Sequence, residues 1–147
     1  MNKTEAPIIV EQIFNSNIDK IWNALTNPVE MKPWYFNTIN SFEPKVGFET
    51  RFVVKVEDRI YPHQWKVTEV VPRKRICYEW QFEGYPGKAV SEFELFEMGI
   101  QTKLKLVYKV IEDFPDNIPE FKRQSGVDGW NYLLKNSLKL YLEKDKT

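Results

Sequence analysis

The middle of the chain alternates hydrophobic and polar residues, which is the pattern of a half-buried strand. The clearest run covers residues 48–56, where Phe48, Phe52 and Val54 share one side of an extended chain and charged residues occupy the other. Comparable alternation covers residues 61–71, 75–82, 88–97 and 100–110. Residues 8–14 and the short stretch 39–42 are rich in β-branched or aromatic side chains, and we expect them to be strands as well.

Two short helices are predicted after the first strand. Apolar residues recur every three or four positions over residues 18–25, and Asn15-Ser16-Asn17 offers caps before them. Asn27-Pro28 ends this helix. A second helix over residues 29–34 has Pro28 at its start, and Pro33 keeps it brief or irregular.

One long helical pattern closes the chain, over residues 120–143. Its apolar positions are Val127, Trp130, Leu134, Leu138 and Tyr141. Gly126 and Gly129 each disfavour a helix by roughly 1 kcal/mol relative to alanine, so we expect it to begin near Ser125 or to bend there. Glycines at this point also allow a helix to approach a sheet closely.

Charge and turn signals suggest the registers of two hairpins. With Asp58 and Arg59 as the loop of the first, the facing inner residues are Val54 with His63 and Phe52 with Trp65. With Met98-Gly99 as the loop of the second, the facing pairs are Glu94 with Lys103, Glu92 with Lys105 and Phe93 with Leu104. Other loops are expected at Pro72–Lys74, at Gly84–Gly87 and between residues 112 and 119.

A strand, two short helices, a long antiparallel meander and a long closing helix predict an α+β fold, with a curved sheet of six to seven strands around the C-terminal helix. The 147 residues suit a single domain, with its core over about residues 8–143. Such a shape encloses space between sheet and helix, so the contents of that space become the functional question.

Composition narrows the classes of partner. Lys plus Arg equals Asp plus Glu, at 21 each, which argues against nucleic acid as the main partner. The single cysteine, Cys77, cannot form an internal disulfide and fits a reducing compartment, so we expect a cytoplasmic protein without a membrane span. No metal-binding, phosphate-loop or hydrolase motif occurs, and we expect neither metal nor cofactor.

The order of elements resembles the helix-grip fold of the START-like (SRPBCC) superfamily. Residues 21–28 (IWNALTNP), continuing to Lys32-Pro33-Trp34-Tyr35, resemble the early motif of the family named for the activator of heat-shock protein 90 ATPase. Gly129-Trp130 with the leucines that follow is similar to its closing-helix motif, and Tyr78-Glu79-Trp80 to its mid-sheet strand. The resemblance covers nearly the whole chain, and it implies the helix-grip fold.

Aromatic residues make up 15% of the chain, and most are predicted to face inward. They either form the wall of an apolar pocket or fill the space by packing on one another. As a pocket, its mouth would lie near the first helices and the Gly84–Gly87 loop. The predicted lining is Trp34, Phe52, His63, Trp65, Tyr78, Trp80, Phe93, Tyr108, Trp130 and Leu134.

The sequence identifies no catalytic residue, and two inward polar residues are weak candidates. Cys77 is a weak candidate for a nucleophile, and a structural thiol is favoured for it. His63 is either an anchor or general base in the pocket or a half-buried histidine bonded to backbone, and the second is favoured because the sequence shows no partner for it. Glu69 faces inward unless a β-bulge turns it out or a basic residue pairs with it, and one of these is favoured because burying a lone carboxylate is costly.

The interpretation that best fits the sequence is a small intracellular protein that binds a hydrophobic small molecule. Two alternatives stay open. The family resemblance implies a stress-related protein acting on a heat-shock protein 90 homologue, and the wider superfamily implies a cyclase- or dehydratase-like enzyme using the same pocket. We expect a monomer or a weak homodimer.

Overall fold

A computed structural model describes residues 1–144 and confirms the α+β helix-grip fold. Six antiparallel strands form one sheet in the order β1-β6-β5-β4-β3-β2. The strands are β1 (Ile8–Phe14), β2 (Glu49–Val56), β3 (Arg59–Val71), β4 (Arg75–Phe82), β5 (Tyr85–Met98) and β6 (Gln101–Glu112). The helices are α1 (Ile18–Thr26), α2 (Pro28–Met31), η1 (Pro119–Phe121), α3 (Arg123–Asn131), η2 (Tyr132–Ser137) and α4 (Leu138–Glu143).

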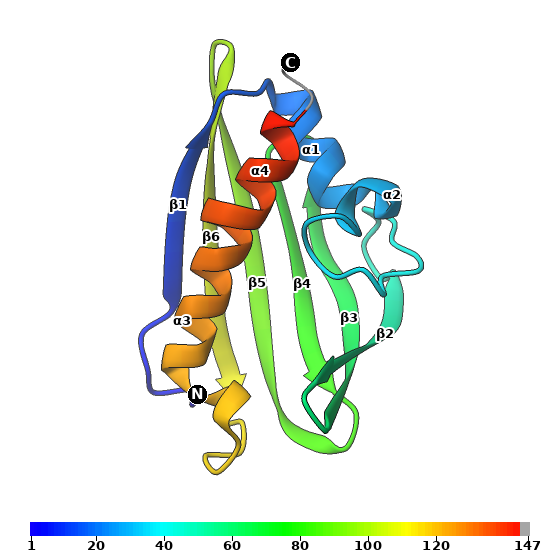
Figure 1. Cartoon of the computed structure of the whole chain (residues 1–147), viewed down its shortest axis with the longest axis vertical. Helices are drawn as coiled ribbons and strands as arrows, with labels where there is room; N and C mark the ends of the chain where they lie inside the picture. Colours follow the sequence, from blue (N-terminus) through cyan, green and yellow to red (C-terminus); the bar gives the residue numbers. More distant parts are fainter. Residues whose placement is uncertain (145–147) are drawn as a thin grey trace.

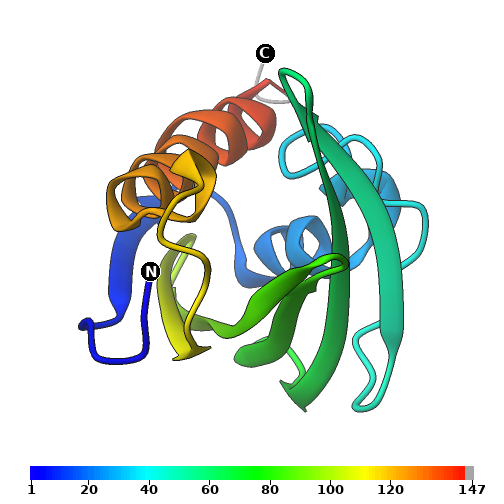
Figure 2. The ribbon, with the colours of Figure 1, turned by 90° about the horizontal axis from the view of Figure 1, so that it is seen from below.

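The sheet curls, and the C-terminal helix lies across the open side of the curve (Figures 1 and 2). In Figure 1 the helix runs obliquely across the strands, and α1 and α2 lie near its C-terminal end. The buried side chains of sheet and helices meet in one hydrophobic cluster between them. Within residues 1–144, no helix has the length and apolar character that crossing a bilayer requires.

The first helix is capped within the segment that the sequence predicts, and Pro28 lies at the start of the second as predicted. The Asn17 side chain accepts a hydrogen bond from the Lys20 backbone N–H at 2.9 Å, and it begins α1. Asn27 caps α2 in the same way, with Pro28 in the first turn. The second helix ends at Met31 instead of continuing toward residue 34, since Pro33 cannot extend it.

Both predicted hairpin registers are wrong by two residues. The loops are Glu57-Asp58 and Gly99-Ile100, so that Phe52 pairs with His63 in the first hairpin and Phe93 with Leu106 in the second. In each loop the first residue has positive φ, 57° at Glu57 and 68° at Gly99, as a tight hairpin turn requires. A shift of two keeps every side chain on its predicted face, so the inner and outer faces stay as predicted.

The opposite-charge pairing on the outer face changes with that register. Glu94 faces Lys105, whereas Glu92 faces Val107. Lys103 lies opposite Phe96 instead, with its ammonium 5.7 Å from the ring centroid. The charge pattern predicted the hairpin correctly but its register wrongly: the predicted register forms two Glu–Lys pairs from these four residues, whereas the observed register forms one of them, Glu94 with Lys105.

Two further sequence expectations are wrong. Residues 39–42 are not a strand: Ile39 and Phe42 are buried, but they fix a loop onto the core without joining the sheet. The loop predicted at Gly84–Gly87 is shorter, because β5 already begins at Tyr85. Gly87 lies inside β5, where an added Cβ would come within 2.3 Å of the Phe114 ring, so its glycine serves a close approach and not a turn.

The C-terminal helix begins at Arg123 and changes from α to π geometry at Tyr132. Trp130, Leu134, Leu138 and Leu142 are all buried and recur every four residues. In a regular α-helix each step of four overshoots a full turn by about 40°, so this row would rotate off the core by about 120°. The wider π turn over Tyr132–Ser137 offsets that drift and keeps the row facing the sheet.

Candidate functional site: an aromatic cleft

A cleft of about 440 Å³ lies between the sheet and the first part of the C-terminal helix. It is bordered by the loop after α2, the β2–β3 hairpin, β4, β6, η1 and α3. A volume of this size falls in the range of small-molecule sites, which are typically concave and mostly apolar. Its lining is dominated by aromatic and aliphatic side chains, and it contains few polar groups.

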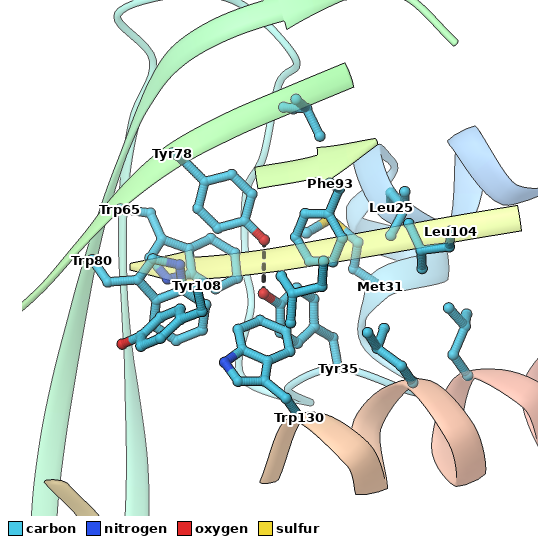
Figure 3. Close-up of a cluster of buried hydrophobic side chains, with 14 of the residues drawn as sticks. Leu25, Met31, Tyr35, Trp65, Tyr78, Trp80, Phe93, Leu104, Tyr108 and Trp130 are labelled. Carbon is cyan, nitrogen blue, oxygen red and sulfur yellow. Dashed lines mark hydrogen bonds between the residues drawn. The ribbon is translucent and has the colours of Figure 1, made fainter. Parts of the chain in front are cut away.

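Trp80 in β4 is the residue around which the polar groups of the cleft gather. Its ring centroid lies 5.7 Å from that of His63, 5.6 Å from Tyr108 and 5.5 Å from Trp130 (Figure 3 shows the last two). Its own indole N–H donates to the Ser91 hydroxyl at 2.9 Å. The polar capacity of Trp80 is therefore used inside the sheet, and its ring presents an apolar surface to its neighbours.

His63 in β3 is held as a neutral hydrogen-bond acceptor. Its Nδ1 lies 2.9 Å from the Tyr61 carbonyl oxygen, which can only accept, so Nδ1 carries the proton and Nε2 is left as the acceptor. Burial lowers the pKa of His63 from 6.5 to about 4, although the backbone hydrogen bond opposes that shift. The imidazole is therefore uncharged at neutral pH.

Aromatic rings surround the His63 imidazole. The rings of Phe36, Phe52 and Phe82 lie 5.1, 5.0 and 4.6 Å from it, in addition to Trp80. None of the phenylalanine rings can donate a conventional hydrogen bond. Nε2 makes no hydrogen bond within residues 1–144.

Tyr108 and Trp130 each add one polar atom to the lining of the cleft. Neither atom has a hydrogen-bond partner among the described residues. The Tyr108 hydroxyl and the Trp130 indole N–H make no hydrogen bond to any residue from 1 to 144. Burial raises the pKa of Tyr108, so its hydroxyl stays protonated. In Figure 3 this hydroxyl points away from the Tyr35–Tyr78 pair.

The rim of the cleft carries a compensated charge. The Arg59 guanidinium and the Tyr61 hydroxyl both donate to Oε1 of Glu120, the latter at 2.9 Å. The Arg59 hydrogen bond holds the pKa of Glu120 below its usual range, and burial together with Glu120 raises the pKa of Tyr61 to about 12. Glu120 thus remains ionised and paired at the entrance.

The predicted lining residues divide into two groups. The structure places His63, Trp80, Tyr108 and Trp130 on the cleft. The other six lie in the core and off the cleft: Trp34, Phe52, Trp65, Tyr78, Phe93 and Leu134. The aromatic set therefore both fills space and lines a cleft, at different depths.

Trp34 illustrates a core role. Its indole N–H donates to the Ala24 carbonyl at 2.8 Å. In an α-helix that carbonyl would accept from residue 28, which is Pro28 and has no N–H. Trp34 therefore satisfies a buried backbone group at the end of α1, and its side chain is only 2% exposed.

Tyr35 and Tyr78 join the loop after α2 to the sheet. Their hydroxyls share a hydrogen bond of 2.7 Å in the core (dashed in Figure 3). Burial is the largest cause that raises the pKa of both phenols. Tyr35 also lines the cleft, as do Phe36 and Gly129, and sequence reasoning did not choose any of the three. The run Trp34-Tyr35-Phe36 was the available signal, but it was expected to end a helix.

Glu69 lies outside the cleft. A bulge between Val67 and Glu69 turns its carboxylate to the outer side, where it pairs with Arg75 at 3.4 Å and accepts from the Cys77 thiol at 3.8 Å. The bulge and the basic partner are the features that sequence reasoning favoured for this residue. Glu69 therefore has no position from which to act on a molecule in the cleft.

A wider hollow of about 720 Å³ lies at the β3–β4 turn and the end of β5. It is rich in charged side chains, and some of them pair with each other or with neighbours. Arg73 bonds Asp19 at 3.0 Å, and Arg75 lies between Glu69 and Glu92. This hollow is lined by many charged side chains, whereas the aromatic cleft has the apolar lining that is typical of small-molecule sites, so the aromatic cleft is the candidate site.

Comparison with known proteins identifies relatives of the sequence and of the fold. The family described as Activator of Hsp90 ATPase homolog 1-like protein matches residues 15–143. No functionally curated protein matches the chain. Solved structures with a similar fold include three that are each less than 25% identical to this chain, so they bear on the fold alone.

DynU16, a protein in the dynemicin biosynthetic locus, is 22% identical to this chain, with a TM-score of 0.74. The match covers 96% of this chain and 48% of DynU16, so this chain spans about half the length of DynU16. A protein from Rhizobium loti is 17% identical with a TM-score of 0.78, covering 92% of this chain and 96% of that one. The Aha1 dimer from Colwellia psychrerythraea is 23% identical with a TM-score of 0.70, covering 97% and 100%.

Proposed function

The chain belongs to the family of Activator of Hsp90 ATPase homolog 1-like proteins, and on that basis we propose that it binds a small hydrophobic molecule in the aromatic cleft. The family supports a small ligand-binding domain in general. The observation that carries the finer proposal is the cleft of about 440 Å³, whose wall is largely aromatic and whose lining carboxylate, Glu120, is paired at the rim. Transfer of an apolar molecule from water to such a wall is favourable.

The cleft supports binding better than acid–base catalysis. A general base works best when its pKa lies near the working pH, whereas burial lowers that of His63 to about 4. The other predicted candidate, Glu69, lies on the outer side of the sheet. His63 is therefore suited to accept a hydrogen bond from a ligand and poorly suited to remove a proton from it.

The first experiment is native mass spectrometry of freshly purified protein, before and after extraction with organic solvent. We expect an additional mass that extraction removes, and its value would indicate the class of the molecule. The same spectra report whether the chain is a monomer or a dimer. A spectrum without bound mass, together with no uptake of an added apolar probe, would contradict the proposal.

A variant that fills the cleft makes this test specific. A Cβ built on Gly129 meets no heavy atom within 4 Å, so Gly129→Leu can extend into open space from a helix that tolerates leucine. We expect Gly129→Leu to lose the bound mass. Lys139→Leu adds the same side chain on the exposed face of α4 and should keep it. Equal retention by both variants would place the ligand elsewhere.

The family description also suggests action on an Hsp90 homologue, and we keep this as the alternative. It predicts that the protein is retained by such a chaperone and alters its ATPase rate. Gly129→Leu separates the two functions, because filling the cleft should abolish ligand binding without changing a chaperone contact made by the outer surface. We further propose a cytoplasmic setting, in keeping with the lone thiol of Cys77.

A further inference from the structure

Three polar atoms beside Trp80 lack a partner within residues 1–144, and their chemistry differs. His63 Nε2 can only accept, since the proton of the ring is on Nδ1. The Trp130 indole N–H can only donate, and the Tyr108 hydroxyl can do either. The three rings lie within 5.5–5.7 Å of the Trp80 ring, so the groups border one part of the cleft.

The acceptor sets the strictest requirement on a ligand. Leaving a buried polar group unpaired costs free energy, and the phenylalanines packed around His63 cannot supply a proton. An apolar ligand that displaced water from Nε2 would incur that cost. A ligand that donates a hydrogen bond to Nε2 avoids it, and its donor atom can in turn accept from Trp130 or Tyr108.

Charge restricts the ligand further. Among residues 1–144, no lysine or arginine lines the cleft, and the one carboxylate that does, Glu120, is already bonded to Arg59 and Tyr61. Burying an unpaired anion in such a place is far more costly than burying a hydroxyl. A carboxylate ligand would therefore find donors for its oxygens but no compensating charge.

We propose that the cleft selects a neutral molecule with a flat apolar body and one hydroxyl group, which lies over Trp80 and donates a hydrogen bond to His63 Nε2. A phenol or an alcohol on a ring system of two or three rings has this chemistry. The inference rests on the proposed function, since it specifies the class of ligand for the same cleft.

Three probes of one shape test the inference: naphthalene, 2-naphthol and 2-naphthoate. Their dissociation constants can be read from the shifts of the tryptophan indole resonances in nitrogen-15 NMR. A net hydrogen bond in a protein corresponds to a preference of about 3- to 10-fold, so we expect 2-naphthol to bind tighter than naphthalene by that factor. We expect 2-naphthoate to bind at least tenfold weaker than 2-naphthol.

His63→Phe provides the decisive comparison, and its readout is the ratio of the naphthalene and 2-naphthol dissociation constants. Removing the acceptor should bring this ratio to about one, whatever happens to the absolute affinities. His63→Gln keeps an acceptor oxygen and should keep a preference for the alcohol, which preserves the test if the phenylalanine variant does not fold.

The outcomes separate the inference from the function on which it rests. Failure of the wild-type protein to bind any of the three probes would overturn the proposed function. Equal binding of naphthalene and 2-naphthol by the wild type, a preference for 2-naphthoate, or an unchanged ratio in His63→Phe would overturn the inference alone. A preference that disappears only when the acceptor is removed is the expected result.

Discussion

The Arg59 side chain at the start of β3 bonds the Glu120 carboxylate in η1, across 61 positions of the chain. Because Tyr61 donates to the same oxygen, one carboxylate joins the β2–β3 hairpin to the segment that leads into α3. Residues from both sides of this contact line the cleft. The pair therefore joins two walls of the candidate site.

Glu120→Gln tests whether this contact stabilises the fold. We expect its melting temperature to fall more than that of Glu83→Gln, because Glu120 has two donors and is only 20% exposed, whereas the Arg51–Glu83 pair is 52% and 55% exposed. Thermal unfolding at low and high salt measures both variants. An equal or larger loss for Glu83→Gln would show that the rim contact contributes no more than an ordinary surface pair.

His63 should make stability depend on pH. Its pKa is about 4 in the folded protein and 6.5 in the reference state, so the unfolded chain binds a proton that the folded chain does not between these values. The stability that the buried neutral imidazole contributes is fully present above pH 6.5 and is lost as the pH falls toward 4. This difference between the two pKa values of His63 corresponds to at most about 3 kcal/mol in the free energy of unfolding.

Urea unfolding of the wild type and of His63→Phe at pH 7 and pH 4.5 isolates that contribution. Carboxylates, Glu120 among them, are also protonated as the pH falls, but they affect the wild type and His63→Phe alike. We expect the wild type to lose more stability than the variant over this interval. Parallel losses in the two proteins would mean that His63 titrates near its ordinary pKa.

Trp34 and Trp65 allow a matched test of a buried hydrogen bond. Both are 2% exposed, but the Trp34 N–H bonds the Ala24 carbonyl whereas the Trp65 N–H is buried without a partner in the described residues. Replacing either by phenylalanine leaves a similar void. We expect Trp34→Phe to cost at least about 1 kcal/mol more, since it leaves a backbone carbonyl unpaired. Chemical denaturation that found Trp65→Phe the more costly would refute this account.

The π segment predicts that one residue can be removed from the C-terminal helix. Deleting the exposed Lys135 shortens one four-residue step to three, and a regular α-helix then keeps Trp130, Leu134 and the two later leucines within one face. We expect this variant to fold with a melting temperature within about 3 °C of the wild type, which corresponds to roughly 1 kcal/mol for a chain of this length. Deleting Asp128 from α3 rotates Gly126 away from Ile8, and we expect it to lower the melting temperature far more. Similar losses for both deletions would contradict the role given to the π turn.

Local pattern predicted the fold well because each signal has a local cause. Alternation identified the five long strands after α2, and Asn17 and Pro28 fixed the starts of two helices. What failed depended on details that alternation does not contain. Choosing between loops one residue apart requires knowing which residue takes positive φ, and Ile39 carries a strand-like side chain on a loop that the core anchors. The π turn leaves a trace in the sequence, in the four-residue spacing of Trp130 and Leu134.

The candidate site was harder to predict, because facing inward and lining a cleft are different conditions. Trp65 and Trp80 are both inward on adjacent strands and face each other, yet only Trp80 borders the open space. That difference depends on where Tyr35 and Phe36 lie, in a loop without a repeating pattern. Glu69 could be placed only through a bulge, which is a shift of register that the sequence does not show.

The most direct measurement of the central claim is a nitrogen-15 NMR titration of the five tryptophan indole N–H groups with 2-naphthol. Trp→Phe variants assign the resonances. If the aromatic cleft is the binding site, Trp130 and Trp80 shift with the added probe, while Trp34 and Trp22, which do not line the cleft, stay in place. Shifts confined to Trp22, or five resonances that do not move at any soluble concentration of the probe, would contradict the account.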